Sequence, residues 1–282
     1  MKSPLLALFA STALATAALA QQPLHLQKAL QLVDEITGQQ DAGVFTDANG
    51  TALNRYGGSW NSATDASFVR FADLANGVYA ANNTKCSPLV THLLKLSYGT
   101  NWKNYSFYDP VLKATKSVAS PTPYQYIVLT KENKGLARVP TLDQAQPGDI
   151  LSWWTVGSDS NDHSMLIVAV DWQSAKAYPA DHALSDPALA GTTYYEVEVV
   201  DSSSGTHTND SRIVSVNGVD TQIPGVGTGT IGLLVNAGFE IVGYTWSLPT
   251  SNYDTQRTGW MNGLHNRLKR TPAYEAVISR LQ

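Results

Sequence analysis

The chain changes character near Pro140, and this change limits the folds open to it more than any other feature. Before that point, apolar residues recur every three or four positions in three separate stretches, which predicts helices. After it come short runs of branched and aromatic residues bounded by glycine, proline or aspartate, which predicts strands. Helices first and an antiparallel sheet second indicate an α+β domain.

The first half of the chain is expected to hold the helices. Residues 25–36 and 68–78 show helical periodicity, and a third helix spans residues 86–98, followed by a glycine that can take the left-handed cap. Residues 124–130 suggest a further short helix. The stretch 38–58 is rich in glycine, asparagine and aspartate and is expected to be a loop.

The second half is expected to build the sheet. An unbroken apolar run of branched residues follows His163, which indicates a buried strand, and a Pro-Gly turn leads into another. The expected strands cover residues 150–154, 163–172, 192–201, 227–235 and 240–247.

Residues 1–20 have the features of a removable export signal. Lys2 precedes a long apolar stretch, and the Ala-Leu-Ala at its end is a small-x-small cleavage pattern. Hydroxyl residues interrupt the stretch, so a membrane-spanning helix is less well supported. We expect a secreted or periplasmic protein without stable membrane insertion.

The charge balance argues against nucleic acid as a partner. The chain has 19 basic and 23 acidic residues, and no basic run occurs anywhere. About 260 mature residues can bury a full core. We expect a monomer with one large domain.

Cys86 is the only cysteine of the chain and stands where a helix is predicted to begin. Unpaired backbone N–H groups and the positive end of the helix dipole favour a thiolate there, and the same groups suit an oxyanion. Pro88 supports this placement, because proline is tolerated in a first helical turn. The competing interpretation is a small buried side chain, since free cysteine is often buried.

A nucleophilic thiol needs a base, and His163 is the best placed of the six histidines. It follows a polar turn and opens an apolar strand. His92 lies six positions along the cysteine helix, about 240° around its axis, and therefore faces elsewhere. A histidine that merely ends a strand is the competing interpretation.

Asp201 is the candidate for the group that orients the base. Alternation places Tyr195, Val197 and Val199 on one strand face, and counting by two reaches Asp201. A carboxylate on a buried face needs a partner, which a histidine on a neighbouring strand would supply. The alternatives are an aspartate that caps the following turn, or His207 as the orienting group.

Three motifs in order, "KCSPLVTHLL", "QPGDILSWW" and "HSMLIVAV", resemble the NlpC-type cell-wall cysteine peptidases of the papain-like group. In that family a Cys-Ser pair begins the core helix, a Pro-Gly-Asp turn enters the first sheet strand, and a histidine opens the next. Lys85 stands where the family usually has aspartate. The resemblance implies a papain-like/NlpC-like α+β fold, with N-terminal helices, including the nucleophile helix, packed on an antiparallel β-sheet.

The resemblance also implies an activity and its residues. Cys86 would be the nucleophile, His163 the base and Asp201 the orienting residue, with Tyr79 as the candidate for a tyrosine near the oxyanion. The implied protein is an exported thiol hydrolase that cleaves an amide bond in peptidoglycan stem peptides. Three tryptophans are candidates for lining the substrate cleft: Trp153, Trp154 and Trp246.

The expected organisation is a signal peptide (1–20), an N-terminal helix and loop (21–60), a papain-like catalytic domain (61–250) and a C-terminal helical extension (251–282). Two other functions stay open: a non-catalytic cell-envelope-binding module on the same scaffold, and a Cys-His-Asp acyltransferase. No cofactor is expected and no metal site is supported. The glycine-rich residues 225–232 lack the lysine of a phosphate-binding loop and are interpreted as a turn and strand entry.

Overall fold

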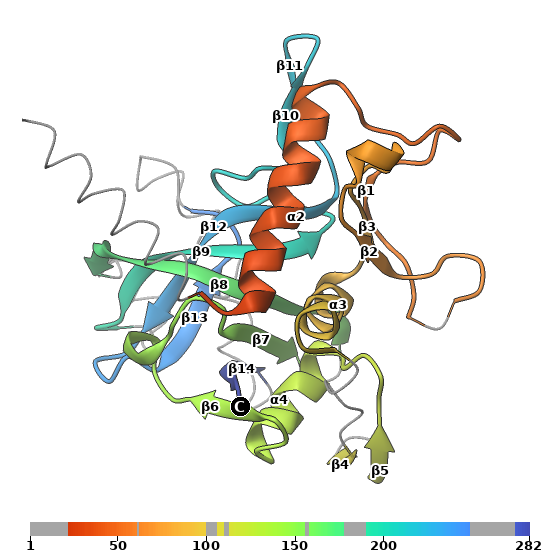
Figure 1. Cartoon of the computed structure of the whole chain (residues 1–282). Coiled ribbons are helices and arrows are strands. Elements are labelled where there is room, and N and C mark those ends of the chain that lie inside the picture. The colour runs from red at the N-terminus through yellow and green to blue at the C-terminus, as the bar shows by residue number, and fades with distance from the viewer. Residues whose placement is uncertain are drawn as a thin grey trace, which may run out of the picture.

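The computed structural model describes residues 22–60, 62–99, 106–109, 113–155, 158–177, 190–248 and 274–282 (Figure 1). The expected export signal lies outside these residues, as do residues 251–273, most of the expected C-terminal extension. The described part contains the α-helices α2 (Leu24–Asp41), α3 (Cys86–Tyr98) and α4 (Pro123–Lys131), and the short 3₁₀ helices η1 (Leu74–Asn76) and η3 (Leu142–Gln144).

Fourteen strands accompany these helices in the described residues. They are β1 (Asn54–Tyr56), β2 (Phe68–Arg70), β3 (Ala81–Thr84), β4 (Ser106–Asp109), β5 (Ala114–Ser117), β6 (Leu136–Val139), β7 (Ile150–Thr155), β8 (Ser158–Ala177), β9 (Thr193–Ser203), β10 (Ile213–Val216), β11 (Val219–Gln222), β12 (Gly225–Val235), β13 (Ile241–Thr245) and β14 (Tyr274–Leu281).

Helical periodicity correctly predicted α2, α3 and α4. The first two each bury one apolar stripe, and α4 begins at a capping box. Its Thr122 hydroxyl accepts a hydrogen bond from the backbone N–H of Gln125, whose side chain accepts one from the Thr122 N–H in return. Pro123 at the first helical position completes this start signal.

A seven-stranded antiparallel sheet is the centre of the fold. Its strand order is β13-β12-β9-β8-β7-β14-β6, and every neighbouring pair runs antiparallel. All five strands expected from the sequence lie in this sheet. Strand β8 is longer than expected: it begins at Ser158 and continues to Ala177. The register places Trp153 opposite His163 and Asp201 opposite Gly227, so this region of the sheet carries polar groups among apolar ones.

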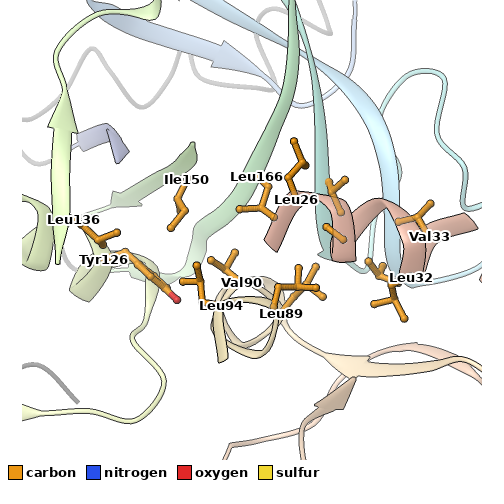
Figure 2. Packing of buried hydrophobic residues seen from close by; sticks show 14 of the residues in the cluster. Leu26, Leu32, Val33, Leu89, Val90, Leu94, Tyr126, Leu136, Ile150 and Leu166 are labelled. Carbon is orange, nitrogen blue, oxygen red and sulfur yellow. The ribbon is translucent and has the colours of Figure 1, made fainter. Parts of the chain in front are cut away.

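Two hydrophobic clusters cover the two faces of the sheet, as the two-residue period requires. Ile150 and Leu166 belong to the first cluster, and their neighbours Leu151 and Met165 to the second. Figure 2 shows the first cluster, in which Leu26 and Leu32 of α2, Leu89 and Leu94 of α3 and Tyr126 of α4 meet sheet residues. These helices therefore lie on one face of the sheet.

A small three-stranded sheet, in the order β1-β3-β2, leads the chain into α3. All four residues of β3 are buried, two of them asparagines. Asn82 donates to the side-chain oxygen of Asn54 and to the carbonyl of Arg55, while the Asn54 amide bonds both ways with the backbone of Val226 in β12. These bonds fix β3, which ends two residues before Cys86, against the large sheet.

The expected papain-like α+β layout is wrong. The protein is mostly β and is built around a large seven-stranded antiparallel sheet, which is not the expected layout of N-terminal helices packed on a sheet. Segments without a clear sequence signal pair as additional strands, because pairing satisfies backbone N–H and C=O groups beside a sheet edge. Two connections also form small sheets of their own: β4-β5 between α3 and α4, and β10-β11 between β9 and β12.

Two expected helices are also wrong. Residues 68–78 form β2 and η1. Val69, Phe71 and Ala72 pack against the first cluster, but Leu74 is 67% exposed, and Gly77 closes the turn with a left-handed φ of 69°. The end of the expected helical extension, Tyr274–Leu281, is β14, which pairs with β7 on one side and β6 on the other. The N-terminal α2 and the C-terminal β14 thus belong to the same core as the residues between them.

Candidate active site

Cys86 is the first residue of α3, where the chain leaves buried β3. The preceding residue, Lys85, has an extended backbone, and its side chain makes no capping hydrogen bond to the helix. The backbone N–H groups of the first turn therefore point toward the region of the sulfur without a side-chain cap. Cys86 is 6% exposed, and its thiol donates to the carbonyl of Asp162 over 3.9 Å.

His163 lies on β8 beside the sulfur and is 6% exposed. Its Nε2 atom is 2.6 Å from Oδ2 of Asp201, so a carboxylate fixes the ring proton on Nε2. Nδ1 is the remaining ring nitrogen for the hydrogen bond with Cys86. The rings of Trp153 and Trp246 pack against the imidazole, at centroid distances of 5.6 and 5.0 Å, and restrict its rotation.

Asp201 lies at the end of the alternating part of β9 and is fully buried. Its Oδ2 atom also contacts Nε2 of His207 at 3.1 Å, and its Oδ1 atom forms an ion pair with Nη1 of Arg212 at 3.1 Å. Three nitrogen-bearing side chains thus surround one carboxylate. The structure brings together the three residues expected from the sequence, Cys86, His163 and Asp201.

The electrostatics of the site favour a thiolate beside an imidazolium. Burial raises the pKa of the Cys86 thiol, but the charge of His163 and hydrogen bonds from His163, Ser164 and Ser87 outweigh burial and leave the pKa below its ordinary value. Burial likewise lowers the pKa of His163, yet the negative charge of Cys86 and the hydrogen bond to Asp201 raise it to about 9. These opposite shifts favour proton transfer from the Cys86 thiol to the His163 ring.

Asp201 stays ionised in spite of its burial. Burial alone raises the pKa of its carboxyl group, but the charges of His207 and Arg212 and the hydrogen bonds from His163 and His207 hold it well below the usual range. An ionised Asp201 can accept hydrogen bonds but cannot donate one. It therefore keeps His163 in the tautomer that presents Nδ1 to the sulfur.

Two cavities meet at the Cys86–His163 pair. The larger, about 560 Å³, is lined by Cys86 and by aromatic residues from several elements: Tyr56, Trp60, Tyr124 and Trp154. The smaller, about 260 Å³, is lined by His163 together with Ser203, Ser204, Gly205, Tyr244 and Trp246. Tyr56 and Asp162 line both cavities, so the two spaces adjoin at the reactive pair.

The expected substrate-binding residues fall in different places. Trp154 lines the larger cavity with its ring 4.2 Å from that of Tyr124, whereas Trp153 and Trp246 line the smaller one. Tyr79 lines neither cavity and is 36% exposed; only its backbone carbonyl is engaged, by Nε of Arg70. The structure therefore does not bring Tyr79 to the sulfur.

Tyr56 is the tyrosine that the sequence reasoning missed. It ends β1 and is followed by two glycines, the second of which, Gly58, has a left-handed φ of 69°. A Cβ atom on Gly58 would lie 2.4 Å from the carbonyl oxygen of Asn83, so only glycine lets this turn pack against β3. Burial and the nearby charges of Cys86 and Asp201 raise the pKa of Tyr56, which keeps its hydroxyl proton.

Arg212 was also missed, and His207 was considered only as a substitute for Asp201. Both reach the site from the segment between β9 and β10, which carries no periodic signal. The one signal in the sequence is that two opposite charges, Asp210 and Arg212, stand two residues apart. That this loop packs on the glycine-rich strand β12 is visible only in the structure.

No group of three or more histidine, cysteine, aspartate or glutamate residues that could hold a metal ion occurs in the described ranges. None of the helices described there is long and apolar enough to cross a membrane. No protein-family model matches the chain, and searches of curated proteins and of solved structures find no significant match to it.

Proposed function

We propose that the protein is a thiol hydrolase that cleaves an amide bond through Cys86, His163 and Asp201. The observation that carries the proposal is the connected arrangement of these groups. A thiol at a helix N-terminus contacts a histidine, the histidine is bonded at 2.6 Å to a buried carboxylate, and the pair adjoins two cavities. This arrangement has the parts that nucleophilic catalysis requires: nucleophile, base and orienting group.

The proposed reaction uses the proton positions described above. Nδ1 of His163 takes the thiol proton, and the Cys86 sulfur attacks the amide carbonyl carbon to give a tetrahedral oxyanion. Backbone N–H groups of the first turn of α3 and the Tyr56 hydroxyl are the donors near that oxygen. His163 then returns the proton to the leaving nitrogen as the C–N bond breaks. Water, deprotonated by His163, hydrolyses the thioester and restores the thiol.

The two cavities give the substrate a direction. The leaving nitrogen must lie near His163, because His163 protonates it, and the smaller cavity is the one that His163 lines. The acyl portion then occupies the larger cavity beside Cys86, against Trp154 and Tyr124. Aromatic side chains can pack against apolar or sugar-bearing parts of a substrate while the polar rim binds peptide groups.

Peptidoglycan stem peptides are the substrate class proposed here. This choice rests on the three short sequence motifs around Cys86, Gly148 and His163 and on the expected export signal. Export would place the enzyme in the compartment where such peptides occur.

Acyl transfer to an amine is the second candidate, and one observation favours it. The cavity beside His163, about 260 Å³, would be emptied when the leaving amine departs and is far larger than one water molecule needs, so an acceptor amine has room there. Hydrolysis and transfer share the thioester and differ only in the group that attacks it.

Cell-wall fragments incubated with the protein in heavy-oxygen water test the proposal. Hydrolysis adds one heavy oxygen to a new carboxyl group, transfer to an amine adds none, and mass spectrometry separates the two products. Cys86→Ala should abolish turnover and leave the circular dichroism spectrum unchanged. Equal turnover by Cys86→Ala would contradict the thiol mechanism. A wild-type thiol that alkylates no faster than an ordinary cysteine would instead support a non-catalytic binding module.

A further inference from the structure

Four charged side chains form a buried cluster behind the candidate site: Asp201, His207, Asp210 and Arg212. Their exposed fractions are 0%, 4%, 7% and 1%. Arg212 donates from Nε and Nη2 to the two carboxylate oxygens of Asp210 at 2.8 and 2.6 Å, in addition to its ion pair with Asp201. Only Asp201 among the four contacts the histidine that faces the sulfur, so the other three act on the site through Asp201.

The two ring nitrogens of His207 both face acceptors. Nδ1 is 2.8 Å from the carbonyl oxygen of Trp246, which can only accept a hydrogen bond. Nε2 is 3.1 Å from Oδ2 of Asp201, a carboxylate that stays ionised. A neutral imidazole has one N–H and one lone pair, and its lone pair would face an acceptor in either tautomer. Both contacts are favourable only when both nitrogens carry a proton.

The charge balance of the cluster leads to the same protonation state independently. Asp201 and Asp210 carry two negative charges, and the guanidinium of Arg212 supplies one positive charge. A buried cluster with an uncompensated charge is strongly disfavoured. An imidazolium at His207 brings the cluster to neutrality, while Cys86 and His163 add no net charge, either as thiol and imidazole or as thiolate and imidazolium.

The glycines of β12 are what make room for this cluster. A Cβ atom on Gly227 would lie 2.6 Å from Cγ of Arg212, and one on Gly229 would lie 2.7 Å from Cβ of His207. The two glycines are two residues apart and therefore share one strand face. The glycine-rich stretch of the sequence is thus the surface against which His207 and Arg212 fit.

We propose that His207 is a positioning residue that carries a proton on both ring nitrogens at neutral pH and, together with Arg212, holds the orienting carboxylate and moves the thiolate range of Cys86 toward lower pH. The inference deepens the proposed function and rests on it. Positive charge near the site stabilises the Cys86 thiolate and opposes proton binding by His163. Two further titratable groups face the cluster: Tyr56 from β1, whose pKa Asp201 helps to raise, and Asp210, which is paired with Arg212 and accepts a hydrogen bond from the backbone N–H of His207 at 2.6 Å.

Nuclear magnetic resonance of the full chain with nitrogen-labelled histidines reads the protonation state directly. The His207 ring is identified by its contact with Trp246, at a centroid distance of 4.2 Å, and by the loss of its signals in His207→Gln. We expect both ring nitrogens of His207 to carry a proton at neutral pH. A bare ring nitrogen on His207 in the wild-type protein would overturn the proposal.

The rate of Cys86 alkylation against pH tests the consequence for the thiol. His207→Gln keeps an N–H donor but removes the charge, so the midpoint should rise by about one pH unit, a tenfold loss of thiolate on the acidic side. His25→Gln is the matched control: it removes a buried histidine that bonds to Tyr98 and Gly148, away from both cavities, and should leave the midpoint unchanged. Equal midpoints in the two variants would refute the role of His207.

The two tests separate this inference from the proposed function. If wild-type Cys86 alkylates like an ordinary thiol and no fragment is cleaved, the proposed function fails, and the inference fails with it whatever the charge of His207. If turnover depends on Cys86 but His207 carries a bare nitrogen, the function stands and the inference alone fails.

Discussion

At the scale of single residues, the site depends on which atom of each side chain carries a proton and which accepts a hydrogen bond. Asp201 holds the proton of His163 on Nε2, and so the other nitrogen faces the sulfur. Tyr56 keeps its hydroxyl proton because burial and neighbouring negative charge raise its pKa. In the proposed mechanism, the donor to the oxyanion and the acceptor of the thiol proton are therefore both set before a substrate binds, which is the condition for electrostatic catalysis.

Replacement of the Tyr56 hydroxyl is the sharpest test at this scale. Tyr56→Phe should lower kcat by about 10-fold to 100-fold with little change in KM, because a donor to the transition-state oxygen is lost while the ring remains. Tyr79→Phe, the matched change at a half-exposed tyrosine outside both cavities, should leave kcat unchanged. Steady-state kinetics of the two variants decide the assignment: a larger loss in Tyr79→Phe would restore the residue that the sequence suggested.

The candidate site also shows which residues a sequence can reveal. Cys86, His163 and Asp201 each follow a local rule: a helix start, a strand start and two-residue alternation along a strand. Tyr56 and Arg212 follow no such rule. They reach the site only because β1 pairs with β3 and the loop before β10 packs on β12, contacts between segments far apart in the chain.

At the scale of elements, strand β12 is shaped by the absence of side chains. Gly227 and Gly229 leave space on one strand face for Arg212 and His207, while the adjoining residues Val226 and Ile231 are buried in the hydrophobic clusters. A strand interior normally loses stability with each glycine. Here the loss is accepted because a Cβ atom would overlap the groups that hold Asp201.

A side chain on this strand should therefore be costly. Gly229→Val should destabilise the protein by about 2–4 kcal/mol, because its Cβ would lie 2.7 Å from that of His207 and the strand would have to shift. Gly238→Ala is the control, since its Cβ would meet only Asn236 Oδ1, at an ordinary 3.4 Å. Urea unfolding monitored by tryptophan fluorescence gives both values. A stable Gly229→Val protein would show that the strand has more room than the described contacts allow.

Two histidines outside the site, His25 on α2 and His92 on α3, bond these helices to neighbouring segments. They predict that the folded protein loses stability in acid. Burial lowers the pKa of His25, which bonds to Gly148 and Tyr98, and lowers that of His92 on α3 to about 4. Both are neutral in the folded protein, so above pH about 6.5 they cause no pH dependence. Below that value the unfolded chain binds protons that the folded chain does not, and stability falls as the pH drops toward about 4.

The double variant His25→Gln/His92→Gln isolates this effect. It should be less stable than the wild type at pH 7, because packing and hydrogen bonds are lost. Its stability should also fall less between pH 6.5 and 4, by about 2 kcal/mol. Urea unfolding at a series of pH values measures both slopes. Parallel pH profiles of the two proteins would assign the acid sensitivity to other groups.

At the scale of the whole molecule, the sequence predicts that an antiparallel sheet exists but not how many strands it has. The apolar runs around Leu151 and Ile167 and the alternation around Val197 correctly indicate β7, β8 and β9, since a buried strand has a strong local pattern. The pairing of β14 between β6 and β7 has no local signal. Residues 68–78 show a helical period, but Leu74, which a helix with this period would bury, is exposed. Periodicity alone therefore overestimates the helical part of the fold.

Deletion of β14 should prevent folding. This strand fills the position between β6 and β7, and Ile278 and Val277 are buried there, while Arg280 donates to both carboxylate oxygens of Asp149 at 2.8 Å. A chain that ends before Tyr274 should lose most of its β signal in circular dichroism and its cooperative unfolding. A chain that lacks only Gln282 is the control and should fold normally. A folded, cooperative protein without β14 would contradict the central role of this strand.

The position of β14 has a consequence for the order in which the molecule matures. Synthesis delivers β6 and β7 long before the strand that joins them, and Trp154, on β7, is part of the wall beside the sulfur. Until β14 is made, the edges of β6 and β7 that it pairs with have unpaired backbone groups, which can also pair with the wrong strand. The strand that carries Trp154 therefore keeps one edge unpaired until the last residues of the chain are made.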